Sequence, residues 1–430
     1  MVVAGAVPFA WLAGLVLKLG VNVPFWDEWA FIPDLQKSAA GRFGLADLWA
    51  QHNEHRLFFP RLIFLPVAHF THWNLRSEMI VSLVLAAAIF VLVVALLRRT
   101  LSPYSRGLFL LSSVAVGWFV FSPVQYQNWL WGWQVQWFLS NLAALGAIAL
   151  LSSWPESRRR WVGVACAIAA AVVASYSLAS GLLVWMACLA VFVPKKRLRP
   201  YLPVWLAAAG VTVGAYLVGY HKPPQTPPLT ALLHHPGAFI AYVLRYLGAP
   251  LFGNNGYSAF VGGAIVGIFV ATTAFLAPRA PEAFSRAVAW VALGFYAMLS
   301  AALTGIGRVG FGVDQSEASR YTTTSTLFLL ATVALVLVAV ASRNYRWNRL
   351  PAAVALGVLG AVLVAGLVAG YKEGLGGMQG THGAMEANRV CLQRVQGPAD
   401  PCLNSVDPGG GLPAWNLLQY LRKAGLGGVR

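Results

Sequence analysis

Long, unbroken runs of apolar residues dominate the chain, and short polar or basic segments separate them. Each run is close to the roughly 20 residues that an α-helix needs to cross the hydrocarbon core of a bilayer. Apolar and polar positions do not alternate within the runs, so the pattern does not favour a membrane β-barrel. We therefore predict eleven membrane-spanning helices, at residues 3–20, 79–97, 106–122, 134–152, 161–177, 180–194, 202–219, 258–277, 287–304, 322–341 and 352–370.

The two spans predicted within 161–194 share a stretch that is short for two crossings. Basic triplets flank it, at residues 158–160 and 195–197. Because basic loops stay on the cytoplasmic side, both triplets belong on one side, which requires an even number of crossings. The first apolar run, 2–19, has no basic leader and no obvious cleavage site, so we expect a first span rather than a signal peptide.

The composition agrees with this pattern. Hydrophobic residues make up 58% of the 430 residues and the mean hydropathy is +0.65. Charged residues make up only 10%, against about 25% in an average soluble protein. These values exclude a soluble enzyme, a disordered chain and a small disulfide-bonded domain. We expect an all-α polytopic membrane protein, with a transmembrane domain over residues 1–370 and a tail over 371–430.

The net charge of +17 does not indicate nucleic-acid binding, because the basic residues stand in small groups at the ends of apolar runs. Eleven spans with a cytoplasmic N-terminus place five basic loops in the cytoplasm and the C-terminus outside. Three polar regions are then external: the first loop (21–78), the segment 220–257 and the tail. Within them, we expect residues 241–251 to lie along the membrane interface. We expect the tail around 408–411 to be loosely ordered. The five loops hold 15 of the 31 basic residues: Arg98, Arg99, Arg106, Arg158, Arg159, Arg160, Lys195, Lys196, Arg197, Arg199, Arg279, Arg286, Arg343, Arg346 and Arg349.

The four cysteines show no spacing that indicates a metal site. Cys166 and Cys188 lie inside apolar runs, where we expect them to be packing residues. Cys391 and Cys402 lie in the external tail, in an oxidising compartment, so we predict that they form a disulfide. Two free thiols are the alternative.

Paired acids follow the first span directly. Asp27 and Glu28 lie between Trp26 and Trp29, which we expect at the membrane interface. An acid between low dielectric and water suits a general base with a raised pKa, and it also suits coordination of a divalent cation. An ordinary solvated loop acid is the alternative. Because no carboxylate between residues 79 and 313 is predicted in a span or on the outer side, a proton-coupled transporter is not favoured.

A second polar group stands at residues 51–56. If this segment is helical, His52 and His55 share a face. We expect Glu54, His55 and above all Arg56 to bind a phosphate or a sugar hydroxyl. A zinc site is not favoured, and plain surface residues are the alternative.

Two further segments carry candidate chemistry. The glycine-rich segment 305–312 precedes Arg320 and Tyr321, and with Arg308 it suits a lipid phosphate. A tight turn with Arg320 at a helix end is the alternative. Aromatic and amide residues fill 123–137, including Gln127 and Trp131, and either bind a sugar or anchor helices at the interface.

The arrangement resembles the GT-C glycosyltransferase superfamily: a multi-span chain, acids directly after span one, and amphipathic helices in the first external loop. The Trp-Asp-Glu-Trp, His-Asn-Glu-His-Arg and Ser-Arg-Tyr segments are also similar to poorly characterised bacterial membrane proteins of this type. The likeness covers the topology throughout and the sequence over about 22–61 and 305–321. There is no large soluble C-terminal domain and no Trp-Trp-Asp signature, so asparagine glycosylation is not expected.

The resemblance implies an inverting enzyme of the bacterial inner membrane, surrounded by membrane lipids. It would transfer a sugar from a polyprenyl-phosphate donor to a glycan or lipid acceptor of the cell envelope, on the external face. Asp27 is then the catalytic base, with Glu28 second, and a divalent cation at these acids is an open alternative. The residues expected to bind the donor are Glu54, His55, Arg56, Arg308, Arg320, Tyr321, Gln127 and Trp131.

Three other functions stay open. A polysaccharide polymerase or ligase would rely on arginine and histidine, with less need of an acid. A flippase or transporter for lipid-linked sugars would need access from two sides and no base. A non-catalytic membrane scaffold is the third.

Overall fold

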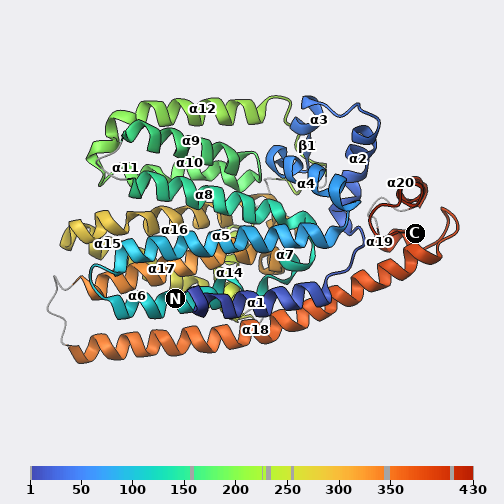
Figure 1. Cartoon of the computed structure of the whole chain (residues 1–430). Coiled ribbons are helices and arrows are strands. Elements are labelled where there is room, and N and C mark those ends of the chain that lie inside the picture. Colours follow the sequence, from blue (N-terminus) through green and yellow to red (C-terminus); the bar gives the residue numbers. More distant parts are fainter. Residues whose placement is uncertain are drawn as a thin grey trace.

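The computed structural model describes residues 2–154, 159–224, 226–228, 234–252, 256–342, 349–406 and 411–429. The expectations for Arg158, Arg343, Arg346 and residues 408–410 fall outside these residues. The described parts form a bundle of long helices, with one two-stranded ribbon (Figure 1). The longer helices are α1 (Val2–Leu19), α5 (Leu75–Leu101), α6 (Arg106–Val120), α8 (Val135–Ser153), α9 (Arg160–Ser175), α12 (Leu202–Leu217), α14 (Pro236–Phe252), α15 (Ser258–Arg279), α16 (Pro281–Arg308), α17 (Thr322–Ala341) and α18 (Arg349–Arg394).

Shorter elements fill the connections. The short α-helices are α2 (Ile32–Ala39), α3 (Leu45–Trp49), α4 (Phe58–Thr71), α7 (Tyr126–Leu130), α10 (Val184–Ala187), α11 (Leu189–Phe192), α19 (Leu403–Val406) and α20 (Gly411–Ala424). The 3₁₀ turns are η1 (Trp26–Phe31), η2 (Pro123–Gln125), η3 (Gly132–Gln134), η4 (Ala179–Leu183), η5 (Lys196–Tyr201), η6 (Val309–Phe311), η7 (Val313–Glu317) and η8 (Ser319–Tyr321). The antiparallel ribbon is β1 (Gln51–His52) with β2 (His55–Arg56).

Eight helical stretches among the described residues are long and apolar enough to cross a membrane: Leu75–Leu101, Arg106–Leu130, Gly132–Ser153, Lys196–Leu217, Ser258–Arg279, Pro281–Phe311, Ser319–Ala341 and Leu356–Arg394. Each coincides with a predicted span. The other three predicted spans, 3–20, 161–177 and 180–194, fall on shorter apolar helices. The chain is therefore an all-α polytopic membrane protein, with eight stretches rather than eleven of full spanning length.

Helix α17 lies inside the bundle, in contact with α8, α14, α15 and α16. Its first turns carry buried hydroxyls that pair with amides on neighbouring helices. Thr323 accepts a hydrogen bond from Asn128 of α7 at 2.7 Å, and Thr324 accepts one from Asn141 of α8 at 3.0 Å. Because a polar group in an apolar bundle needs a partner, these pairs hold α17 in one register against α7 and α8.

Residues 241–251, expected along the membrane interface, belong to α14 and pack against α15, α16 and α17. Tyr242 and Tyr246 are fully buried. A Cβ atom at Gly248 would lie 2.0 Å from the Ser258 carbonyl oxygen of α15, so the two backbones touch. Small residues permit this close approach, which the hydropathy of the segment does not reveal.

The tail is largely helical where it is described. Helix α18 continues without interruption to Arg394, well past the predicted end of the last span at residue 370. The predicted disulfide between Cys391 and Cys402 is confirmed. Helix α20 folds back, and Arg422 donates to two carbonyl oxygens at the end of α18, at 2.8 and 2.9 Å. These carbonyls have no partner within the helix, so the cation stabilises its end.

The first loop and the tail share one hydrophobic core, in which Trp29 and Trp73 lie with Leu392 and Leu418. The backbone N–H of Gly427 also donates to the carbonyl of His72. Figure 1 shows α2, α3, α4, α19 and α20 at one end of the bundle, and the ends of α5 and α15 that carry basic residues at the other. The two large polar regions thus lie at the same end, as the predicted topology requires.

Reporter fusions test which end is cytoplasmic. We expect a reporter fused after Arg197 to lie in the cytoplasm and one fused after Arg430 to lie outside, because basic loops are retained on the cytoplasmic side. The activities of a pair of reporters that work on opposite sides of the membrane measure this. A cytoplasmic reporter after Arg430 would contradict the orientation.

Candidate functional site

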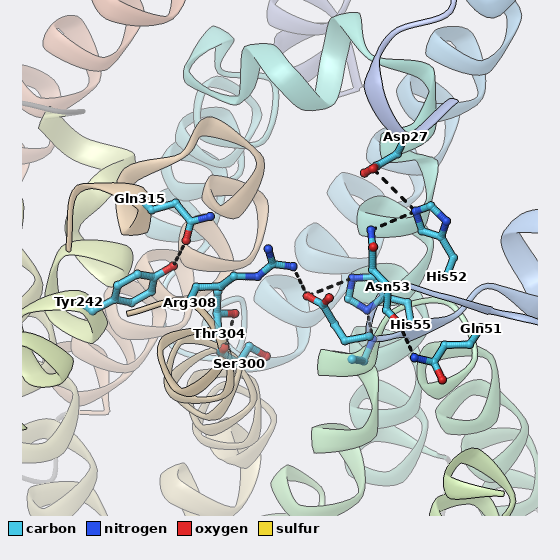
Figure 2. Close-up of polar contacts among 12 residues, drawn as sticks. Asp27, Gln51, His52, Asn53, His55, Tyr242, Ser300, Thr304, Arg308 and Gln315 are labelled. Atoms are coloured by element: carbon cyan, nitrogen blue, oxygen red, sulfur yellow. Dashed lines mark hydrogen bonds and ion pairs between the residues drawn. The ribbon is translucent and has the colours of Figure 1, made fainter. Parts of the chain in front are cut away.

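Four segments meet where the first loop covers the end of the bundle. Turn η1 carries Asp27, the ribbon carries residues 52–55, the end of α16 carries Arg308 and η8 carries Arg320. Figure 2 shows Asp27, the ribbon and Arg308 gathered in one region. Both Arg320 and Arg308 are close enough to lower the pKa of Asp27. The structure therefore brings residues predicted from three separate parts of the sequence into one site.

Asp27 is the most open carboxylate of this site. Its side chain is 38% exposed, and one of its oxygens lies 3.9 Å from Nε2 of His52. Burial raises the pKa of Asp27 above its usual value, although Arg320 and Arg308 act in the opposite direction. The preceding Trp26 has a φ of 50°, which is unfavourable for a bulky side chain. The surrounding contacts thus hold a strained turn that presents an accessible carboxylate of raised basicity.

The ribbon places a tight turn over the site. His52 pairs with His55 across the two strands, and Asn53 between them has a φ of 48°, which asparagine tolerates. The two histidines therefore do not share a helix face, because the segment is extended. His52 lies beside Asp27, while Nδ1 of His55 accepts a hydrogen bond from the backbone N–H of Ala179 at 3.2 Å.

Glu54, at the turn of the ribbon, is ion-paired with Arg308. Its carboxylate also lies 3.8 Å from Nε2 of His55. Burial raises the pKa of Glu54, but His55 and Arg308 outweigh it and lower the value to about 2. Glu54 is therefore a weak base at neutral pH, and its contribution is to fix the ribbon against α16.

Arg320 supplies a cation that has no carboxylate partner among the described residues. Its guanidinium lies 3.4 Å from Oε1 of Gln127 and over the ring of Tyr321, 5.0 Å from the centroid. Both backbone polar groups of Arg320 are hydrogen-bonded. The side-chain amide of Asn128 donates to its carbonyl at 2.9 Å, and Oε1 of Gln127 accepts from its N–H at 3.2 Å. Most of its N–H donors are consequently available to a ligand.

Glu28, expected as the second candidate base, is buried. Its two carboxylate oxygens accept backbone hydrogen bonds from Phe25 at 2.7 Å and from Trp133 at 3.1 Å. Glu78 lies beside it, because both carboxylates pack against Gly132. A Cβ atom at Gly132 would be 2.6 Å from the carboxylate of Glu78 and 3.2 Å from that of Glu28. Burial, and then the charge of Glu78, raise the pKa of Glu28 well above its usual range. Glu28 therefore stabilises the strained turn and is not open to a substrate.

Two residues expected to contact the donor have structural contacts instead. Arg56 is buried, and its guanidinium donates to three backbone carbonyls, two of them at the C-terminal end of α12. Trp131 is also buried, and its indole N–H donates to the carbonyl of Phe25 at 3.1 Å. Sequence position places both near the membrane surface, but only the fold shows that their donors are already used.

The glycine-rich segment 305–312 is helical in its first half, so the backbone N–H groups there are used within the helix. Helix α16 continues through it to Arg308. A Cβ atom at Gly305 would lie 2.9 Å from the ring of Phe239 on α14. Gly305 therefore permits close packing of two helices, and Gly312, with a φ of 108°, permits the turn that follows.

The aromatic and amide segment 123–137 is mostly packed inside the bundle. Gln125, Asn128, Gln134 and Gln136 are all buried. This favours the role in helix packing over a sugar-binding platform. Gln127 is the exception, because it reaches the site through Arg320.

Some neighbours of the site were not predicted. The hydroxyl of Tyr242, on α14, donates to Oε1 of Gln315 at 3.3 Å, next to Arg308 (Figure 2). Glu78, at the last position of the predicted first loop, lies beside Glu28, and the sequence did not predict this proximity. No motif marks either residue, since packing between distant segments creates both contacts.

The acids considered for a divalent cation do not face one another. Asp27 faces His52, whereas Glu28 faces the backbone of Phe25 and Trp133. Within the described parts of the chain, no group of three or more His, Cys, Asp or Glu side chains is placed to hold a metal ion.

No protein-family model, no curated protein and no solved structure matches this chain.

The environment of His52 predicts a pH dependence of stability. Burial lowers the pKa of His52 to about 4, from an ordinary value of 6.5. Between these values the unfolded chain binds a proton that the folded protein does not, so His52 lowers stability as the pH falls through this window and has no such effect above it. We expect His52→Gln to lose less thermal stability than the wild type between pH 7 and pH 5.

The exposed His69, in the same loop, provides the matched control. His69→Gln should keep the wild-type loss of stability over the same pH range. If His52→Gln loses as much thermal stability as the wild type, the pH dependence does not come from the lowered pKa of His52.

Proposed function

We propose that the protein transfers a sugar from a polyprenyl-phosphate-linked donor to a glycan or lipid acceptor of the cell envelope. One observation carries the proposal: an open carboxylate, Asp27, lies near an arginine, Arg320, that has no carboxylate partner among the described residues. A carboxylate can take a proton from a hydroxyl, and a guanidinium can hold a phosphate through paired hydrogen bonds.

The position of the site supports a lipid-linked donor. Turn η1 begins shortly after α1, and η8 leads directly into α17, so both catalytic groups stand at the ends of apolar helices. A lipid chain could stay in the membrane while its phosphate meets Arg320. The first loop and the tail cover the same end, where a water-borne acceptor would arrive (Figure 1).

The proposed reaction is a direct displacement. Asp27 takes the proton from an acceptor hydroxyl, and that oxygen forms a bond to the anomeric carbon of the sugar. The bond from this carbon to the phosphate oxygen breaks, and the lipid phosphate leaves with the bonding electrons. Arg320 stabilises its negative charge, while Arg308, paired with Glu54, adds positive potential. A single displacement inverts the anomeric centre.

Asp27→Asn tests the base. The substitution is nearly isosteric, so folding and donor binding should persist while turnover falls by about 10²–10⁴-fold. The measurement is transfer from a polyprenyl-phosphate sugar by the purified protein, beside a thermal-stability scan. Near wild-type turnover would remove Asp27 as the base.

Glu28→Gln is the matched control for Asp27→Asn. It removes the neighbouring carboxylate, whose oxygens hold the backbone of Phe25 and Trp133. We expect lower thermal stability, with the folded fraction still active. A loss of turnover at full stability would instead assign the base to Glu28.

Arg320→Lys tests the phosphate contact. Lysine keeps the charge but loses the forked donor set, so affinity for the donor should fall by about tenfold, and Arg320→Ala should weaken it further. Donor binding is measured directly on the purified protein, with Arg42→Ala, at an exposed arginine of the first loop, as the control. Unchanged donor affinity in Arg320→Ala would show that the residue serves only packing.

A further inference from the structure

A cavity of about 480 Å³ lies at the end of the bundle opposite the candidate site. It is lined by the ends of α5 and α8, the start of α9, residues 194–198 and one residue of α16. These segments are far apart in the sequence and meet only in the folded protein. None of the residues assigned to the candidate site lines this cavity.

The cavity is strongly basic. Five of its lining residues are cationic, and none of its described lining residues is acidic: the five are Arg99, Arg160, Lys195, Lys196 and Arg197. The side chains of Arg99, Arg160 and Lys196 form no hydrogen bond or ion pair with a described residue. Arg199, in the same loop but outside the cavity, instead donates to the carbonyls of Phe192 and Val193.

Like charges held around one cavity repel one another, and repulsion is stronger beside the low-dielectric protein than in open water. An anion inside the cavity would relieve that repulsion and accept charge-assisted hydrogen bonds. Phosphate suits such a site because its oxygens match the forked donors of arginine and the ammonium of lysine.

The remaining walls of the cavity favour an amphiphile. Leu150, Leu151, Val164 and Leu198 contribute apolar surface. Trp154 also lines the cavity, and its indole N–H is buried without a hydrogen-bond partner among the described residues. Basic pockets between membrane helices are places where anionic lipid head groups bind.

Membrane topology alone explains positive charge at this end, but it does not explain the cavity. Retention of a loop on the cytoplasmic side requires only positive charge. Arg98 and Arg106 provide such charge as exposed side chains outside the cavity. We infer that this cavity is a binding site for a phosphate group, and that the apolar walls favour the phosphate of a phospholipid in the adjacent leaflet. The inference does not depend on the proposed function.

Binding to the full-length purified protein tests the inference, with short-chain phosphatidylglycerol, short-chain phosphatidylcholine and inorganic phosphate as probes at constant ionic strength. The double variant Arg160→Gln/Lys196→Gln should bind the anionic probe at least about tenfold more weakly than the wild type. The control Arg98→Gln/Arg106→Gln removes the same charge from the same end and should stay within about twofold, because neither residue lines the cavity.

The probes separate the two sources of phosphate. Binding of phosphatidylglycerol that inorganic phosphate does not displace supports a lipid, and binding of inorganic phosphate in its place supports a soluble ligand. An equal loss of affinity in the control variant would overturn the site. The wild type also gives a test without variants: if neither anionic probe raises its melting temperature above that in phosphatidylcholine and chloride, the inference is wrong.

Discussion

The ion pair between Glu54 and Arg308 is the contact on which the candidate site depends. It joins the ribbon of the first loop to the end of α16, across a sequence separation of 254 residues. Both side chains are partly buried, so removing either partner would leave the other charge with weaker compensation in a partly desolvated place. While the pair is made, the ribbon lies against the bundle and His52 stands beside Asp27. The ion pair thus acts together with the hydrogen bonds of Arg56 and His55, which hold the same ribbon.

Three nearby carboxyl groups, those of Asp27, Glu28 and Glu54, differ in their environments and therefore in their roles. Glu54 is kept ionised by Arg308 and His55, whereas the pKa of the buried Glu28 is raised by desolvation and by Glu78. Asp27 lies between these extremes, with a raised pKa and an accessible side chain. Acid chemistry requires such differences, because a group that is fully paired or fully buried cannot exchange a proton with a substrate.

The two ends of the bundle differ in the segments and side chains that form them. At one end, the first loop and the tail pack around a shared hydrophobic core. The other end consists of short basic loops that close around a cavity. The long helices separate the two ends, so the side chains of the candidate site lie apart from the five cationic side chains that line the cavity.

The amino-acid sequence by itself determined the membrane class and the helix positions. All eight full-length apolar helices lie where the runs predicted them, because a backbone in lipid can satisfy its hydrogen bonds only within a helix. The disulfide between Cys391 and Cys402 was also predictable, since the two residues are close in the chain. Hydropathy also made Asp27 a candidate site residue, because this acid follows the first apolar run.

Only the tertiary structure decided which polar groups are free to act. Arg56 and Arg320 look equivalent in the sequence, yet Arg56 has its donors occupied by backbone carbonyls and Arg320 does not. Glu28 and Asp27 are neighbours, yet only Asp27 is accessible. Gly305 stands in a glycine-rich segment, yet it lies inside a helix and permits close packing against Phe239. The physical reason is common to all three: a pattern of hydrophobicity reports how deep a residue lies, whereas its partners come from segments that are remote in the chain and meet only when the bundle closes.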